Sequence, residues 1–258
     1  MHLAEAENTD QAVNSTLIYT VSCRGKTYRE PVMSFLKNNF ADTPLGQIDS
    51  LFGFVEPCTL YGGRPYQEAQ FSNADVQQMY AHGIGLRIPL TNHYVDEAEY
   101  RSYDWFFDKY HREGNSVIAH SDKLAEWLRR DYPLFKLESS VIKDINTYAK
   151  IDAALKLYDT VVLPMPLNYD REFLSGIVDK SRITLFANAG CALNCPNRIC
   201  YRSVSKINKF KPAEFKCSKK VKDRDILGMV DFDLEQLAAL GFRRFKLLRS
   251  KPHGVTAF

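Results

Sequence analysis

Short apolar segments alternate with amphipathic segments along most of the chain. Eight of the apolar segments are rich in β-branched and aromatic residues and lie beside turn residues, as β-strands do. They cover residues 17–23, 48–57, 84–90, 116–120, 135–141, 160–166, 183–190 and 242–249. We therefore predict a strand in each of these segments.

The segments between the strands carry helical patterns. In residues 121–132, Ser121 is suited to cap a helix that places Leu124 and Leu128 on one face. Similar patterns occupy residues 73–83, 170–180 and 233–242, the last of which ends at Gly241.

This alternation of strands and helices predicts an α/β protein built as a single TIM-like (β/α)8 barrel. An open, doubly wound sheet is the alternative, but no G-x-G-x-x-G follows the first strand to favour it. We expect residues 16–258 to form one barrel domain with a cysteine-rich, basic loop at about 188–225. Residues 1–15 are expected to be a flexible N-terminal segment.

Composition narrows the class of protein. The chain is 45% hydrophobic and 25% charged with a net charge of +3, which is ordinary for a globular protein and too weakly basic to indicate nucleic-acid binding. No apolar run approaches the roughly 18–20 residues that span a bilayer, and the polar start does not resemble a signal peptide. We predict a cytoplasmic protein with no membrane contact. Because that compartment disfavours disulfides, clustered cysteines indicate a metal or redox site.

Functional groups of a TIM barrel lie where its strands end, at the C-terminal face. Arg64 follows two glycines, which let the backbone approach a ligand closely, and its guanidinium is suited to grip a carboxylate. Each polar residue at these ends has a plainer alternative as a cap, a loop residue or one half of a salt bridge. As candidates for catalysis we name His93 and Lys246, and for substrate binding Arg64, Asn92, Asn168, Asn188 and Arg198.

The cysteines after the seventh strand are the most specific feature of the chain. Their spacing is C-x3-C-x4-C-x16-C, formed by Cys191, Cys195, Cys200 and Cys217. Structural zinc sites favour a C-x2-C turn, which is absent here, whereas iron–sulfur clusters accept wider spacings. We predict that the four thiols bind an iron–sulfur cluster, with zinc and inert or redox-active thiols as alternatives. Cys23 or Cys58 is able to replace one of the four, because each ends a strand at the same face.

The segment from residue 198 to residue 224 contains many more Lys and Arg than Asp and Glu. Such a segment can bind RNA, an anionic small molecule or an acidic partner subunit, or it can be a solvated surface loop.

Several of these motifs occur in an order that resembles the collagenase-like peptidase family U32. They are "GGRP" at 62–65, "NH" at 92–93, "PLN" at 166–168, "NAGCALNCPNR" at 188–198 and "LGFRRFKLLR" at 240–249. The resemblance covers nearly the whole chain from about residue 17, and its most specific part is N-x-G-C-x-x-x-C-P-x-R. It implies a barrel and, in several branches, a 4Fe–4S cluster held by four cysteines.

The resemblance also implies two kinds of activity: peptidase activity, and oxygen-independent hydroxylation of ubiquinone precursors or of RNA, in some cases by paired related subunits. The chain has no H-E-x-x-H, no G-x-S-x-G and no local cysteine-protease signature. We therefore expect an oxidoreductase of the hydroxylase kind, acting on an organic acid, another small molecule or RNA. The alternatives are a peptidase and a non-catalytic, cluster-binding subunit that pairs with a related barrel.

Overall fold

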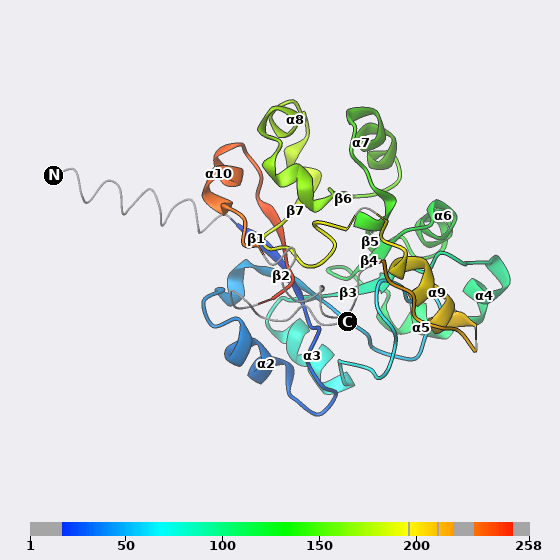
Figure 1. Ribbon diagram of the computed structural model, residues 1–258. Coiled ribbons are helices and arrows are strands. Elements are labelled where there is room, and N and C mark those ends of the chain that lie inside the picture. The colour runs from blue at the N-terminus through cyan, green and yellow to red at the C-terminus, as the bar shows by residue number, and fades with distance from the viewer. Residues whose placement is uncertain (1–16, 196, 211, 219–229, 250–258) are drawn as a thin grey trace.

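A closed barrel of eight parallel strands forms the centre of the protein (Figure 1). The computed structural model describes residues 17–195, 197–210, 212–218 and 230–249, and the predicted segment 1–15 lies outside them. The strands follow one another round the barrel in chain order, and β1 pairs with β8 to close it. The single TIM-like (β/α)8 barrel is therefore confirmed, and the open sheet is excluded.

Each strand lies inside its predicted segment. β2 is shorter than predicted because the chain leaves the sheet at Gly53, where a Cβ would come within 2.7 Å of Gln70 and of Phe71. The strands are β1 (Ile18–Ser22), β2 (Ile48–Phe52), β3 (Gly85–Leu90), β4 (Ser116–Ala119), β5 (Lys136–Ser139), β6 (Thr160–Val162), β7 (Ile183–Phe186) and β8 (Arg244–Leu247).

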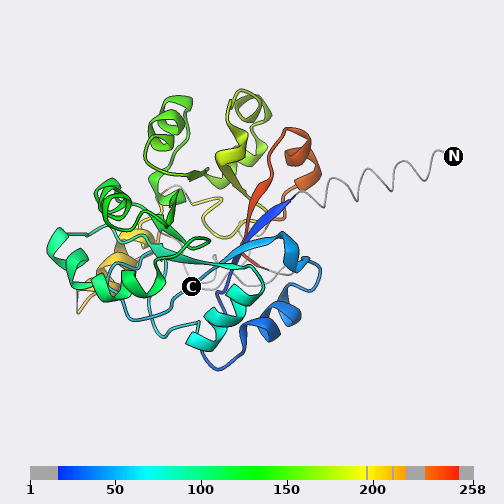
Figure 2. The same cartoon turned by 180° about the vertical axis from the view of Figure 1, so that it is seen from behind.

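An outer ring of helices surrounds the strands and is visible from both sides (Figure 1, Figure 2). The helices are α2 (Val32–Asn39), α3 (Asn73–Ala81), α4 (Glu97–Ser102), α5 (Asp104–Tyr110), α6 (Asp122–Asp131), α7 (Tyr148–Leu155), α8 (Arg171–Ser175), α9 (Cys200–Lys209) and α10 (Leu234–Ala239). Short 3₁₀ helices cover Leu45–Gln47, Val141–Lys143, Met165–Tyr169 and Lys180–Arg182. The Ser121 hydroxyl caps α6 by accepting from the Leu124 N–H at 3.4 Å, as predicted.

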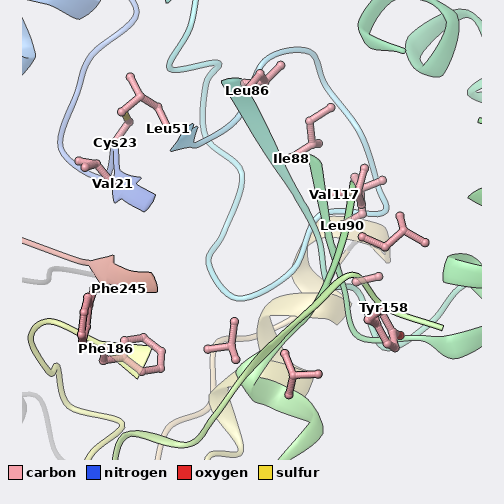
Figure 3. Packing of buried hydrophobic residues seen from close by; sticks show 14 of the residues in the cluster. Val21, Cys23, Leu51, Leu86, Ile88, Leu90, Val117, Tyr158, Phe186 and Phe245 are labelled. Carbon is pink, nitrogen blue, oxygen red and sulfur yellow. The ribbon is translucent and has the colours of Figure 1, made fainter. Parts of the chain in front are cut away.

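The two-residue period of the strands separates an apolar outer layer from a polar interior. The outer side chains pack between the strands and the helices; Val21, Leu51, Leu86, Ile88, Val117 and Phe245 are examples (Figure 3). Alternate positions carry buried polar side chains instead, namely Thr20, Ser50, Arg87, Ser116, Glu138, Thr184 and Lys246.

Glu138 joins three strands across the barrel interior. Its carboxylate accepts from Lys246 Nζ at 2.7 Å and from the Arg87 guanidinium, and Arg87 also pairs with Asp49 at 3.0 Å. Because β3, β5 and β8 are not neighbours, these contacts are made through the inside of the barrel. Burial alone would raise the pKa of Glu138, but Arg87 and Lys246 hold it at about 2, so the carboxylate stays ionised.

Candidate functional site

A cavity of about 190 Å³ lies at the C-terminal ends of the strands, directly above the polar interior. Its floor is built from residues two positions beyond the inward-facing polar layer, because alternate residues of a strand share a side. These floor residues are Ser22, Phe52, Pro89, Ile118, Ser140, Phe186 and Leu248. The remaining walls come from Lys246 on β8 and from the loops that follow β1, β2, β3, β5, β6 and β7.

All four predicted cluster ligands line this cavity: Cys191, Cys195, Cys200 and Cys217. Burial raises the pKa of the Cys200 thiol to about 11, and repulsion from the charged forms of the other three adds to the shift. The four thiols are therefore near enough for their charges to interact, although among the described residues no three Cys, His, Asp or Glu side chains are placed to hold a metal ion. The six cysteines, all within the described residues, form no disulfide.

Ser203 helps to position the segment that carries Cys217, which is the last of the four cysteines in the chain. On α9, the Ser203 hydroxyl donates to the Glu214 carbonyl at 2.9 Å and accepts from the Lys216 N–H at 2.6 Å. Together these bonds fold the segment 212–218 against α9. Ser218 then contacts Cys195, with 3.2 Å between Oγ and Sγ.

Cys23 and Cys58 are buried and do not line the cavity. Burial raises the pKa of Cys23, and it raises the pKa of Cys58 to about 12. Both thiols therefore remain protonated at neutral pH and behave as core residues.

Arg64 reaches the cavity from the loop after β2. This loop passes so close to β3 that a Cβ on Gly62 would come within 2.3 Å of the Thr91 carbonyl oxygen, and Gly63 has a φ of +79°. The guanidinium of Arg64 lies 4.4 Å from the centre of the Phe54 ring and donates to Gln70 Oε1. The glycines thus permit a close approach of this loop to the backbone at Thr91, and the approach to a ligand that the sequence predicted stays a prediction.

Arg24, at the end of β1, lines the same cavity, and the sequence reasoning gave it no role. Burial lowers the pKa of Arg64 to about 9, and the positive charge of Arg24 adds to that shift. Burial also lowers the pKa of Arg24, while Cys191, Tyr201 and Cys200 oppose the shift. Two guanidinium groups therefore line the same cavity as the four cysteines.

Two further cations line the cavity, and each has an acidic partner. Arg198 NH1 pairs with Asp144 Oδ1 at 2.9 Å, and Lys246 Nζ pairs with Glu138. Burial lowers the pKa of Lys246, an effect that Glu138 opposes. Of the residues predicted as site groups, Arg64, Arg198, Lys246 and the four cysteines thus meet in one cavity.

The three predicted asparagines lie outside this cavity and bind backbone groups instead. Asn92 Nδ2 donates to the carbonyl oxygens of Thr59, Tyr61 and Ser205 at 2.8, 3.2 and 3.0 Å. Asn168 Nδ2 donates to the Phe186 carbonyl at 2.7 Å. Asn188 joins the ends of β7 and β8 through the Leu248 N–H and the Arg249 carbonyl, each at 2.9 Å. A role for them in substrate binding stays a prediction.

His93 also lies outside the cavity lining. Its Nδ1 is 3.0 Å from Ser205 Oγ, and its ring centre is 4.3 Å from that of His120. Burial, together with the charges of His120 and Arg202, lowers the pKa of His93 to about 4, so the ring is neutral at pH 7. Catalysis by His93 stays a prediction.

The basic segment is only partly described, since Lys211, Lys219, Lys220, Lys222 and Arg224 fall outside the described residues. Lys209 at the end of α9 pairs with Asp96 at 3.1 Å and with Glu99 at 2.7 Å, which fixes α9 beside α4 (Figure 1). Arg202, Lys206 and Lys216 are exposed. RNA binding by this segment stays a prediction.

The fold and this cavity define a TIM-barrel protein with a cationic, cysteine-lined cavity at the C-terminal face. The structure of this chain is similar to the solved structure of the U32 peptidase Mk0906, with a TM-score of 0.61 and 14% sequence identity. The match covers 92% of this chain and 94% of that chain. The chain therefore has a U32-peptidase-like fold, as its motifs predicted. No family model and no curated protein matches the sequence. In the part of the chain that the structure describes, no helix has the length and apolar character needed to span a membrane.

Proposed function

We propose that Cys191, Cys195, Cys200 and Cys217 hold a 4Fe–4S cluster and that the protein is an oxidoreductase acting on an organic molecule bound in the same cavity. One observation carries the proposal: four thiols from the chain between residues 191 and 217, on both sides of α9 and at its start, line one cavity. Asp, Glu and His do not occur among the described lining residues, so the donor set is entirely sulfur. Thiolates are the usual ligands of iron–sulfur clusters.

The surroundings of the thiols suit such a group. Arg24 is close enough to Cys191 and Cys200 for their charges to interact, and a cation there stabilises thiolates. Among the described residues, no three Cys, His, Asp or Glu side chains already form a complete metal site. The proposal therefore rests on the convergence of the thiols and on their chemistry. Zinc, the alternative metal, would use the same ligands.

A bound cluster supplies one-electron transfer at the mouth of the barrel. The reaction class that we propose is hydroxylation without molecular oxygen, in which R–H and water give R–OH, two protons and two electrons. An external electron acceptor takes up the electrons. The chain's own residues bind and orient the substrate: apolar floor residues exclude water, Arg64 holds an acidic group, and the Lys246 ammonium, 5.0 Å from the centre of the Phe52 ring, faces the floor.

The first test is to purify the protein without oxygen and to measure iron, zinc and acid-labile sulfide together with an absorption spectrum. We expect about four irons and four sulfides per chain. Cys191→Ser and Cys195→Ser should lose them, whereas the matched variants Cys23→Ser and Cys58→Ser should keep them. One zinc per chain would instead make the loop a zinc site. A wild-type protein without either metal would contradict the proposal.

Peptidase activity is the second candidate, because the similar solved structure is that of a U32 peptidase. The cavity offers this reaction little support. His93 is hydrogen-bonded to a serine, but Ser205 is fully buried and its hydroxyl donates to the Tyr201 carbonyl at 2.9 Å. Cleavage of denatured collagen or of a peptide library by anaerobically purified protein would favour the peptidase.

Pairing with a related barrel subunit is a further proposal, and co-expression with such a subunit followed by size-exclusion chromatography tests it. A monomer that turns over substrate alone would exclude an obligatory partner.

A further inference from the structure

We propose that a second cavity, at the N-terminal end of the barrel, binds a small zwitterion, and that this ligand is a free α-amino acid. The cavity has a volume of about 280 Å³ and lies where β1, β2, β3, β4 and β5 begin. It shares no lining residue with the cysteine-lined cavity at the other end of the barrel. The proposal therefore goes beyond the proposed function and does not depend on it.

Three neighbouring strands bring a row of hydrogen-bond donors to this cavity. In the parallel pairing, Arg87 on β3 lies opposite Ser116 on β4, and Ser116 lies opposite Lys136 on β5. Paired residues of adjacent strands point to the same side of a sheet, so a guanidinium, a hydroxyl and an ammonium group share one wall of the cavity. Such a wall is suited to a carboxylate.

Arg87 is held in one orientation before any ligand arrives. Its side chain is almost completely buried, and its Nε donates to Ser50 Oγ at 2.9 Å. Its NH1 pairs with Glu138, and its NH2 pairs with Asp49 Oδ2 at 3.0 Å. Because a guanidinium carries five N–H groups, these three contacts fix the group and still leave donors for a ligand.

Three polar groups of the lining have no partner in the part of the chain that the structure describes. Ser116 is only 3% exposed, yet its hydroxyl makes no hydrogen bond. Within the same described ranges, Lys136 Nζ and Asp49 Oδ1 take part in no hydrogen bond or ion pair. A buried polar group is costly unless it is hydrogen-bonded, so a polar ligand that reached all three groups would be stabilised by them.

The charges at this cavity are of both signs and cancel. Arg87 and Lys136 are two cations, and the Asp49 and Glu138 carboxylates that pair with Arg87 are two anions. A simple anion would meet Asp49, and a simple cation would meet Lys136. A ligand with both charges matches the site when its carboxylate lies on the donor row and its ammonium group lies on Asp49 Oδ1. A free α-amino acid carries these two groups on one carbon.

Calorimetric titration of the full chain tests the proposal. The probes are glycine, alanine, serine, threonine, glutamine and leucine, each compared with its N-acetyl derivative and with its amide. The N-acetyl derivative lacks the ammonium group, and the amide lacks the carboxylate. We expect at least one amino acid to bind about tenfold or more tightly than either of its derivatives.

Three variants locate the binding. Lys136→Met should weaken it about tenfold or more, while the matched variant Lys123→Met on the exposed face of α6 should leave it unchanged. Asp49→Asn should remove most of the preference for the amino acid over its N-acetyl derivative. Gly46→Leu should block the site, because Gly46 lines the cavity and a Cβ added there meets no atom within 4 Å, so the new side chain has room without moving the backbone.

Lys136→Met and Gly46→Leu should keep the thermal unfolding midpoint of wild type. An N-acetyl derivative that binds as tightly as its amino acid would show a plain anion site, and an equally tight amide would show a plain cation site; either result would overturn the proposal. The same holds if no probe binds, or if Lys136→Met and Gly46→Leu leave binding unchanged. Amino-acid binding by a protein that holds no iron would uphold this proposal and contradict the proposed function.

Discussion

Asp144 and Arg198 are joined by an ion pair of 2.9 Å, and both have left-handed backbone conformations, with φ values of 52° and 45°. No other non-glycine residue in the described ranges has a positive φ. The left-handed conformation costs a non-glycine residue about 1–2 kcal/mol. The pair therefore fixes a strained junction between the cysteine loop and the turn that ends the 3₁₀ helix after β5.

Breaking this pair should loosen the cysteine loop. In Asp144→Asn the new side chain tolerates the left-handed conformation but no longer attracts Arg198. Since the pair is partly exposed, we expect the free energy of local opening of the cysteine loop to fall by about 0.5–1 kcal/mol. This corresponds to a roughly two- to five-fold faster exchange of amide hydrogens in residues 191–200. Hydrogen exchange measured by mass spectrometry checks this. Asp144→Gly, which also relieves the backbone strain, serves as the control, and identical exchange in wild type and Asp144→Asn would refute the role of the pair.

Removal of the charge on Glu138 should destabilise the whole barrel. In Glu138→Gln the buried cations Arg87 and Lys246 lose their shared partner, and a buried charge left without its partner costs about 3–5 kcal/mol. Unfolding in urea measures the loss. Glu126→Gln, on the exposed face of α6, is the matched control. Arg87 keeps its pair with Asp49 at 3.0 Å, so adding Lys246→Met to Glu138→Gln removes the cation that is left without an acidic partner and should recover part of the stability; no recovery would argue against the charge explanation.

Asn92 should prove to be a structural residue of the barrel rim. It is fully buried, and its amide joins the loop after β2 to α9 through three carbonyl oxygens, while its Oδ1 accepts from the Tyr94 N–H at 2.8 Å. Asn92→Ala leaves these groups unsatisfied, so we expect a loss of about 3 kcal/mol in the free energy of unfolding. A variant of wild-type stability that fails to bind or turn over substrate would instead support the role in substrate binding that the sequence predicted.

The barrel could be predicted from the sequence because its strands are short, rich in β-branched and aromatic residues, and regularly separated by helical patterns. The ends of the strands were harder to place. β2 stops at Phe52 and not at residue 57, and just beyond it the Phe54 carbonyl accepts from the backbone N–H groups of Gln70 and Phe71 at 2.8 and 3.2 Å instead of pairing with a neighbouring strand. Such a contact has no local signal in the sequence.

The candidate site, too, could be predicted from the sequence only in part. The four cysteines, Arg64, Arg198 and Lys246 line the cavity at the C-terminal face, where chain position at a strand end is enough to place a residue, and their roles there stay a prediction. Whether a side chain then points to the cavity or bonds a nearby backbone group depends on loop contacts that the sequence does not reveal. The sequence therefore predicted substrate binding for three asparagines whose side-chain amides bond backbone groups. Glu138 was overlooked, although a charge inside the apolar strand 135–141 was a usable signal for a polar interior.

Acidification should weaken the contact between His93 and α9. The pKa of His93 is about 4 in the folded protein, against about 6.5 for histidine in an unfolded chain. As the pH falls from 6.5 to 4 the unfolded chain therefore binds the proton first, and the folded state loses stability through this window. The pKa of His120 is also lowered, by burial first, so its effect has the same sign; Lys143 and Arg202 disfavour a further positive charge there, and Asp122 favours it.

Urea unfolding at pH 7, 6, 5 and 4.5 measures this dependence. His93→Asn cannot take up the proton. Between pH 7 and 4.5 we therefore expect its free energy of unfolding to fall by on the order of 1 kcal/mol less than that of wild type, after allowance for the partial exposure of the ring. His82→Asn, at the exposed end of α3, controls for the substitution itself. Parallel pH profiles for wild type and His93→Asn would show that the ring does not titrate in this window. Because His93 contacts Ser205 on the helix that begins at Cys200, the same acidification should also speed the loss of any metal that the cysteines hold.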